Sequence, residues 1–223
     1  MKRATTRELM DDPVESLAEL EASLADLERA NRYLGGVTPL REMIFSRGAT
    51  SVLDVGCGSA DIPLAVASAA QAQGRKISIT CTDVSEQMLD IARRRTREHP
   101  ALRFERADGT ALPYADSSFD VVTCDLALHH FAPDHAVSLL GEMRRVARIT
   151  PIVCDLRRGF LAWLGVWFLA QVATRNRLTR NDGPLSVRRA YTPDEALALA
   201  RRAGWSKPCV RKTPFFRMLL CDA

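Results

Sequence analysis

Two glycines and an acidic residue follow a short apolar run, and together they could form a binding loop for a nucleoside. Residues 52–61 read as a buried strand that ends in a glycine turn and leads into an alanine-rich helix. Gly56 and Gly58 allow a sharp bend and let a ligand approach the main chain, which a Cβ atom would obstruct. Asp61 stands where the dinucleotide fingerprint G-x-G-x-x-G has its third glycine. Because an acid repels a diphosphate, the sequence disfavours a pyrophosphate-binding loop.

Four short motifs in this chain resemble those of class I S-adenosylmethionine-dependent methyltransferases. They lie at residues 54–58, 77–85, 107–109 and 118–122, in the family's order and at strand-sized spacing. The family's cofactor carries a sulfonium and an ammonium instead of phosphates, so an acidic loop suits it. The resemblance implies an α/β class fold: a Rossmann-like, doubly wound, seven-stranded sheet with a final antiparallel strand, preceded by a helical lid.

The resemblance assigns S-adenosyl-L-methionine as the cofactor and gives several acids a role. Asp83 would accept hydrogen bonds from the ribose hydroxyls, because Ser85 is the better N-cap candidate and leaves Asp83 free. Asp54 would face the methionine ammonium, and Asp108 would contact the adenine amino group, with Gly109 close to the ring. The expected cofactor-binding residues are Asp54, Gly56, Cys57, Gly58, Asp83, Val84, Met88, Asp108, Gly109, Asp125 and Leu126.

A histidine pair follows the fourth strand, where the resembled family forms the floor beneath the methyl group. A neutral imidazole of His129 or His130 could take a hydroxyl proton while the oxygen attacks the methyl carbon in line. His130 is the better candidate for a catalytic base because Phe131 and Pro133 indicate that the chain turns there. A role for both histidines in packing or substrate positioning stays open.

Residues 112–120 are most similar to the branch that includes ubiquinone and menaquinone biosynthesis methyltransferases and many natural-product O- and C-methyltransferases. No Asn-Pro-Pro-Tyr or Asp-Pro-Pro-Tyr sequence follows the fourth strand, so nucleic-acid methylation is disfavoured. We expect a small hydrophobic acceptor, aromatic or polyketide-like, with O-methylation favoured over C-methylation. The candidate substrate-binding residues are Trp163, Trp167, Arg189 and Tyr191.

Alternating apolar segments place these residues on a sheet. Strands are predicted at 51–55, 77–82, 102–107, 119–124 and 149–155, and helices at 61–73, 85–98, 134–147 and 194–203. Two late segments, 208–213 and 215–221, would pair as a hairpin around Pro214. Residues 178–193 are rich in turn-forming residues and are expected to form a connection. The ligand would bind where the carboxyl ends of the parallel strands meet.

The flanks of the sheet are less specific. An apolar stripe predicts a helix over 13–34, with Asp12 as N-cap, Pro13 at the first position and Glu15 at the third. Residues 1–36 would form a helical lid or cap, with packing and dimerisation as alternatives, and residues 37–223 the methyltransferase domain. Within that domain residues 157–192 would form a helical insertion on the substrate side.

The apolar run 160–170 is flanked by arginines and is shorter than the about 20 residues that span a bilayer. It could be a buried helix, a wall of the substrate pocket or an interfacial membrane helix, and we favour the first two.

Composition limits the remaining choices. The net charge is +4, and residues 157–217 hold 13 Lys and Arg against 3 acids, which could attract an acidic substrate or form a solvated surface. Six cysteines without a C-x-x-C pair read as buried thiols, so neither a metal site nor disulfides are expected, and Cys57 reads as a small filler of the loop. We expect a cytoplasmic monomer or homodimer without nucleic-acid partners or stable membrane insertion.

Two alternatives remain. A NAD-dependent dehydrogenase is opposed by Asp61 and by the lack of a recognisable hydride-transfer set. A catalytically inactive, cofactor-binding regulatory module would keep the same binding residues, so only a test of acceptors separates it from an enzyme.

Overall fold

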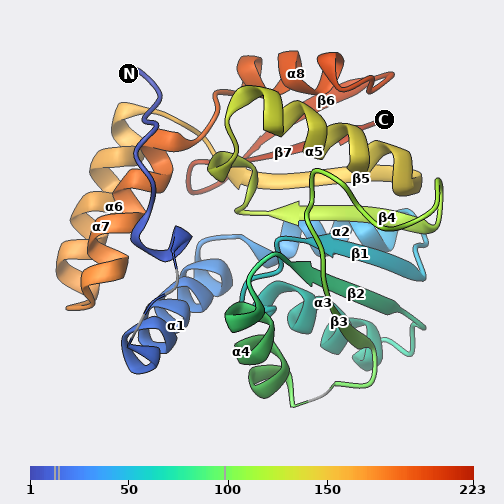
Figure 1. The fold of residues 1–223 in the computed structure, drawn as a ribbon, viewed down its shortest axis with the longest axis horizontal. Helices are drawn as coiled ribbons and strands as arrows, with labels where there is room; N and C mark the ends of the chain where they lie inside the picture. Colours follow the sequence, from blue (N-terminus) through green and yellow to red (C-terminus); the bar gives the residue numbers. More distant parts are fainter. Residues whose placement is uncertain (13, 15, 98) are drawn as a thin grey trace.

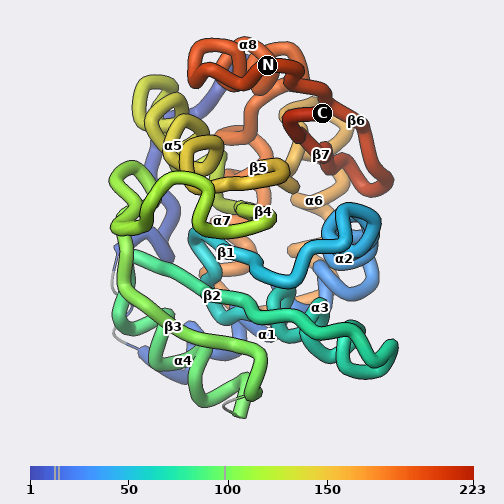
Figure 2. Tube along the Cα trace, turned by 90° about the vertical axis from the view of Figure 1, so that its right-hand side faces the viewer, coloured from blue at the N-terminus to red at the C-terminus, as the bar shows by residue number. Residues whose placement is uncertain are grey.

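The computed structural model describes residues 1–12, 14, 16–97 and 99–223, and within them seven strands form one sheet. The strand order is β3-β2-β1-β4-β5-β7-β6 (Figures 1 and 2). The parallel strands are β1 (Ser51–Val55), β2 (Ser78–Asp83), β3 (Leu102–Arg106), β4 (Phe119–Asp125) and β5 (Ala147–Leu156). The last two, β6 (Pro208–Thr213) and β7 (Arg217–Asp222), form an antiparallel hairpin, and β7 pairs with β5. The predicted sheet and its antiparallel end are confirmed.

Helices cover both faces of the sheet. One face carries α2 (Val37–Ser46), α3 (Asp61–Ala72) and α4 (Glu86–Thr96), and the other carries α5 (Pro133–Val146) and α8 (Pro193–Arg202). Because successive strand residues point to opposite faces, Leu53 and Val122 pack toward α5 and α8, whereas their neighbours Val52 and Val121 pack toward the other helices. The sheet is therefore buried on both sides, which explains its near-continuous apolar strands. Helix α2 was not predicted.

Three further helices lie beyond the carboxyl ends of the parallel strands, at the left of Figure 1: α1 (Leu17–Tyr33), α6 (Phe160–Ala173) and α7 (Arg177–Arg189). The predicted start of α1 was wrong. Ser16 is the N-cap and accepts a hydrogen bond from the Glu19 amide at 3.3 Å, while Asp12 has an extended backbone. Pro13 and Glu15, which were expected in the first turn, lie outside the described residues.

Helix α7 replaces the connection that was predicted for residues 178–193. The Asn176 side chain caps it by accepting hydrogen bonds from the amides of Leu178 and Thr179 at 2.8 and 3.2 Å. Leu178 and Val187 are buried, so α7 is held by packing in spite of Gly183 and Pro184 in its interior. Tertiary packing here outweighs turn propensity.

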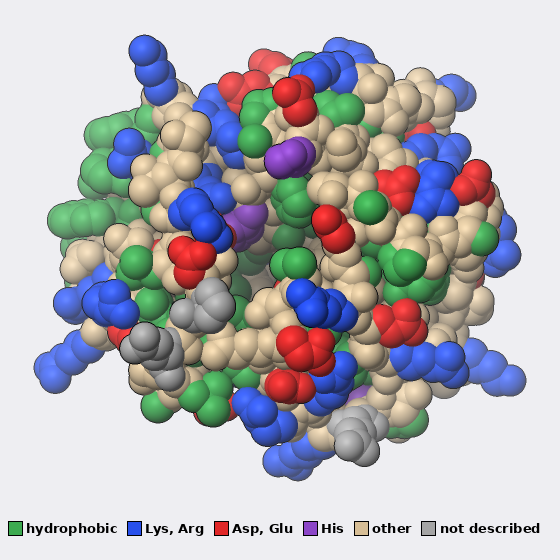
Figure 3. All heavy atoms as spheres, in the orientation of Figure 1, with side chains coloured by type: hydrophobic (Ala, Val, Ile, Leu, Met, Phe, Trp, Pro, Cys, Tyr) green, Lys and Arg blue, Asp and Glu red, His purple; other side chains and the backbone are tan. Residues whose placement is uncertain are grey.

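Helix α6 holds the apolar run 160–170, and much of it faces outward: the exposed fraction is 70% for Leu161 and 60% for Phe168. Apolar side chains gather at the left edge of the molecule, over α6 and α7 (Figure 3). Within the described ranges, no helix combines the length and the apolar character that crossing a bilayer requires.

Candidate active site

The glycine loop after β1 has the geometry that its sequence predicts. Gly56 has φ +74°, and its amide donates a hydrogen bond to the Thr82 carbonyl at 2.8 Å. A Cβ atom at Gly56 would lie 2.9 Å from the Cβ of Ala127, so only glycine fits there. Gly58, with φ +53°, has no atom within 4 Å of an added Cβ among the described residues, and its amide points to Asp83. The loop is thus packed on one side and open on the other.

Ala60 and Cys57 complete this loop without contributing reactive groups. Ala60 has φ +57° although it carries a Cβ, and it is fully buried at the start of α3. A hydrogen bond with Cys81 and burial raise the pKa of the Cys57 thiol well above its ordinary value. Cys57 is therefore a neutral, buried side chain, in line with the filler role expected for it.

Four acids gather around the loop at the carboxyl ends of β1, β2 and β4 and at the start of α3: Asp54, Asp61, Asp83 and Asp125. Burial raises the pKa of Asp54 to about 7 and that of Asp125 to about 8. One oxygen of Asp54 accepts a hydrogen bond from Thr123 at 2.6 Å, whereas the Oδ1 of Asp125 is buried without a partner among the residues described. Acids in this state favour a cationic ligand and disfavour a diphosphate, so the site fits a sulfonium and an ammonium.

Asp83 was expected to be free, and it is not. Its two oxygens accept hydrogen bonds from the amides of Gly58 at 3.0 Å and Ser85 at 2.9 Å. Ser85 caps α4 as predicted, accepting from the Met88 amide at 3.3 Å. Because a carboxylate offers about four acceptor positions, Asp83 keeps capacity for two further donors while it ties the loop to β2.

The adenine-side candidates differ in what surrounds them. Asp108 is exposed, and its Oδ1 accepts hydrogen bonds from the Thr110 amide and hydroxyl at 2.8 and 2.7 Å, which lower its pKa. Gly109 is buried, and a Cβ atom there would lie 2.7 Å from Val55 and 2.9 Å from Leu139. Core packing therefore already requires this glycine, independently of any ligand.

The three apolar candidates have different surroundings: Val84, Met88 and Leu126. Val84 has an exposed fraction of 64%, which leaves it available as apolar cover. Met88 is partly buried against a small cluster formed by α1 and α4. Leu126 has φ +50°, and its amide donates to the Cys154 carbonyl at 2.9 Å, which turns the chain sharply after Asp125.

The histidine pair lies in a short 3-10 helix, η2 (Leu128–His130), directly after β4. The Nδ1 atom of His129 lies 2.7 Å from Asp155 Oδ1, and its backbone amide donates to Asp155 Oδ2 at 2.9 Å. The Nδ1 atom of His130 lies 2.6 Å from Asp11 Oδ1. Side-chain exposure is 3% for His129 and 33% for His130, so His130 is the more accessible of the two.

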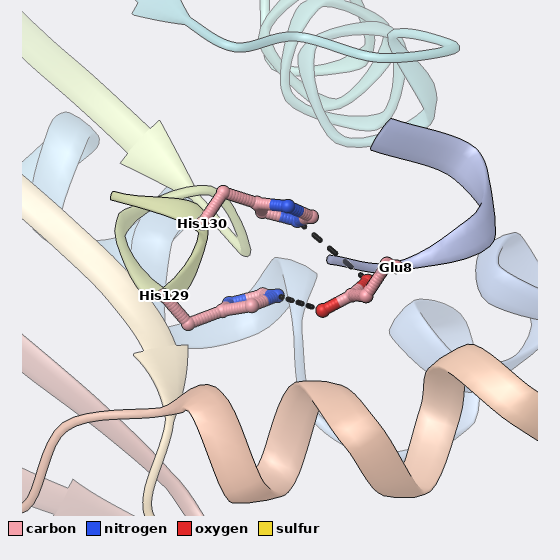
Figure 4. Close-up of side chains that lie close together, drawn as sticks. All are labelled: Glu8, His129 and His130. Carbon is pink, nitrogen blue, oxygen red and sulfur yellow. Dashed lines mark ion pairs between the residues drawn. The ribbon is translucent and has the colours of Figure 1, made fainter. Parts of the chain in front are cut away.

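An N-terminal segment, residues 1–12, brings Glu8 against both histidines (Figure 4). The Nε2 atom of His129 lies 3.6 Å from Glu8 Oε1, and that of His130 lies 3.9 Å from Glu8 Oε2. Burial raises the pKa of Glu8 to about 7. The segment is fixed by Asp182, which accepts hydrogen bonds from the amides of Leu9 and Met10 at 2.9 and 3.1 Å.

Arg189 and Tyr191, the predicted substrate residues, lie beside this cluster and are buried. The Arg189 guanidinium is buried, pairs with Asp11 at 2.5 Å and donates to the His130 carbonyl at 2.9 Å. The Tyr191 hydroxyl donates to the Phe131 carbonyl at 2.8 Å. Both side chains thus form hydrogen bonds within the protein, and they hold the backbone of η2 and Phe131 in place.

Trp163 and Trp167 are placed on α6 and not in this cluster of hydrogen bonds. Trp163 is partly buried and lies beside Phe160, with ring centroids 5.9 Å apart. Trp167 has an exposed fraction of 43%. A large part of the predicted apolar wall thus faces outward, and neither tryptophan lines the cavity beside His130, so their role as substrate residues stays a prediction.

A cavity of about 390 Å³ opens next to His130. Its lining is basic, with Arg3, Arg7 and Arg189 around Asp11 and His130. The space-filling view shows a hollow in the middle of the face that Figure 1 presents (Figure 3).

Sequence reasoning missed Glu8, Asp11, Asp155 and Arg3. Asp155 near the end of β5 could have been found by the strand-end rule that found Asp54 and Asp83, because it occupies the same edge of the sheet. The others lie in the N-terminal segment, which has no apolar periodicity. Arg3 lies 4.1 Å over the Tyr191 ring and donates hydrogen bonds to the carbonyls of residues 129 and 131 at 2.9 and 2.8 Å.

Comparison with known proteins agrees with this geometry. Residues 52–149 match the family model of a methyltransferase domain. The demethylmenaquinone methyltransferase of Staphylococcus haemolyticus is 36% identical over 99 residues, which is 44% of this chain and 39% of that protein. The chain spans about two fifths of the length of the curated relatives it matches.

Solved methyltransferases share the fold at low identity. Human N-acetylserotonin methyltransferase, in complex with S-adenosylmethionine, is 18% identical with a TM-score of 0.66, over 99% of this chain and 62% of that one. Magnesium protoporphyrin IX methyltransferase from Synechocystis, with bound S-adenosylhomocysteine, is 16% identical with a TM-score of 0.59, over 94% and 88%. Residues 52–149 thus match the family model of a methyltransferase domain, and the chain shares the fold of solved S-adenosylmethionine-dependent methyltransferases.

Proposed function

We propose that this chain transfers the methyl group of S-adenosylmethionine to a small, largely hydrophobic acceptor, aromatic or polyketide-like, at oxygen in preference to carbon. The observation that carries the proposal is the position of the histidine pair beside the acid-lined loop, with each Nδ1 atom on a carboxylate. S-adenosylmethionine supplies a methyl group on a positively charged sulfur.

The residues of the chain divide the work around this cofactor. Asp54 and Asp125 are proposed to hold its ammonium end, because Asp54 and the Oδ1 atom of Asp125 are buried and neither acid has a cationic partner at hydrogen-bond distance within the described ranges. Asp83 is proposed to accept hydrogen bonds from the ribose hydroxyls with its remaining lone pairs. These contacts would bind and orient the cofactor. Holding the methyl acceptor and the sulfonium in line would supply most of the rate enhancement.

The histidine pair is proposed to take the hydroxyl proton of the methyl acceptor. A carboxylate at Nδ1 keeps the proton on that nitrogen, so that the Nε2 lone pair is free to take a hydroxyl proton. His130 is the candidate base, because it is more exposed than His129 and borders the cavity. The arginines that line the cavity favour a phenolic or acidic acceptor, whose negative charge they would stabilise.

The test is a panel of phenols, hydroxylated polyketides and quinols, incubated with S-adenosylmethionine and analysed for methylated products by mass spectrometry. His130→Gln should lower kcat by about 10²–10⁴-fold, the usual contribution of a general base, and leave cofactor affinity unchanged. His99→Gln, in the turn before β3, is the matched control and should keep full activity.

Each outcome has a separate meaning. An unchanged rate in His130→Gln would leave that residue a positioning role. Cofactor binding without turnover of any acceptor would favour an inactive regulatory module. Binding of NAD in place of S-adenosylmethionine would favour a dehydrogenase.

A further inference from the structure

The geometry points to a binding site for one divalent transition-metal ion, of the zinc type, at Glu8, His129 and His130. The ligand atoms of the three side chains all lie within 4.8 Å of one another. Figure 4 shows both imidazoles directed at the Glu8 carboxylate from the same side. Two imidazoles and one carboxylate are a donor set that suits zinc, cobalt, nickel and iron. This inference goes beyond the proposed function and does not rest on it.

The hydrogen bonds behind the two histidines match those of metal ligands. A ligating histidine usually donates its second ring N–H to a carboxylate, which fixes the ring and leaves the other nitrogen for the metal. The Nδ1 atom of His129 lies 2.7 Å from Asp155, and that of His130 lies 2.6 Å from Asp11. Both Nε2 atoms therefore carry the free lone pair and face the same point.

The spacing of the donors is close to that of a bound ion. Two ligands about 2.0–2.1 Å from one tetrahedral ion lie about 3.4 Å apart. The distance from His129 Nε2 to Glu8 Oε1 is 3.6 Å, and that from His130 Nε2 to Glu8 Oε2 is 3.9 Å. Since all three donor atoms lie within 4.8 Å of one another, rotation of the side chains would bring them onto one ion.

Glu8 supplies an independent indication of a ligand. Its side chain is 3% exposed, and Oε1 is buried with no hydrogen-bond partner in the part of the chain that the structure describes. A buried carboxylate oxygen without a partner is costly. The nearest cation is the Arg189 guanidinium, at 3.7 Å from Oε1 and already paired with Asp11.

Carboxylates lie directly against the two imidazoles. The acids that face the two imidazoles are Glu8, Asp11 and Asp155. Two guanidiniums lie nearby: Arg189 pairs with Asp11, and Arg3 donates a hydrogen bond to the His129 carbonyl. The neighbouring cavity is lined by further arginines, so the attraction for a divalent ion would come from the Glu8 carboxylate at the ligand atoms and not from the net charge of the region. The ion would also fasten the N-terminal segment to the turn after β4. The ion and an acceptor proton would compete for the same nitrogens.

The test uses the untagged full chain, stripped with EDTA and titrated with Co²⁺ and Zn²⁺. We expect one Co²⁺ per chain, with visible ligand-field bands and no thiolate charge-transfer band, and a rise in melting temperature with Zn²⁺. Glu8→Gln and, separately, His130→Gln should weaken binding at least about tenfold, and Asp11→Asn about 10–100-fold. Glu19→Gln, a charge change of the same kind on α1, should bind like wild type.

A second control excludes the cysteines. Cys209 and Cys221, whose sulfurs lie 2.9 Å apart, are an alternative pair of zinc ligands, and Cys209→Ser should leave binding unchanged. Binding that survives Glu8→Gln and His130→Gln, or that is lost in Cys209→Ser, would overturn the site, as would the absence of binding at millimolar metal. None of these readouts needs the methyl acceptor.

Discussion

Replacing Asp83 by alanine tests the cofactor site most directly, because the affinity of the protein for S-adenosylmethionine can be measured before the methyl acceptor is known. Two of the roughly four acceptor positions of this carboxylate are used by the amides of Gly58 and Ser85, at 3.0 and 2.9 Å. The other two positions are those proposed for the ribose hydroxyls. Losing this pair of charge-assisted bonds should cost about 1–3 kcal/mol, or about 5–150-fold in the Kd for S-adenosylmethionine.

The assay is calorimetric titration with S-adenosylmethionine and S-adenosylhomocysteine, together with a thermal melt of each variant. Asp83→Asn keeps one acceptor oxygen, so its Kd should lie between those of wild type and Asp83→Ala. Asp90→Ala is the matched control, because Asp90 is an exposed acid on α4 whose partner is Arg93. That control should bind both ligands like wild type.

The result that refutes the ribose role is an unchanged Kd in a folded Asp83→Ala protein. A second contradiction would be that Asp83→Asn and Asp83→Ala have the same Kd and that both variants lose the same amount of melting temperature. In that case Asp83 would support the loop through Gly58 and would not contact the cofactor.

Three further changes test other parts of the molecule. Gly109→Ala should destabilise the fold by about 1–3 kcal/mol, because the new methyl would lie 2.7 Å from Val55, and denaturant melts of Gly109→Ala with and without Val55→Ala measure this overpacking. For Asp120, burial opposes ionisation, but backbone amides and the Arg148 guanidinium outweigh it and lower the pKa. Its stabilisation is therefore present above about pH 4, the unfolded value, and is lost as pH falls. Asp120→Asn should therefore cost most stability at pH 7, and its cost in urea melts should decline gradually as the pH is lowered from about 4 toward the lowered pKa of the folded state. Trp167→Ala should raise the acceptor KM without changing the cofactor Kd if α6 lines the pocket, and an unchanged KM would place Trp167 outside it.

The sheet and the cofactor edge were predictable because short-range patterns determine them. Strand-length apolar runs alternate with helices, and the acids that end β1, β2 and β4 must meet at one edge when the strands are parallel. Gly56 was identifiable for the same local reason, since its φ of +74° excludes most other residues. The fold and one half of the site thus follow from spacing along the chain.

The other half depends on contacts between distant segments. Gly183 and Pro184 are turn formers, yet they lie inside α7, which is held by packing and by the Asn176 cap. The N-terminal segment has no periodic pattern, and its position is set by Asp182, which accepts two of its amides. Local propensity carries no information about such partners, so neither feature could be predicted.

The histidine pair shows why the distinction matters for function. The sequence supplies two adjacent imidazoles, but Asp155 and Asp11 decide which ring nitrogen of each is free. With both Nδ1 atoms bound to carboxylates, both Nε2 atoms face the Glu8 carboxylate. Under the proposed function His130 would accept a proton on Nε2, and under the metal proposal Glu8 and both Nε2 atoms would hold one ion. The nitrogens available for either proposed role therefore depend on Asp155, Asp11 and Glu8, and only folding brings these residues to the pair.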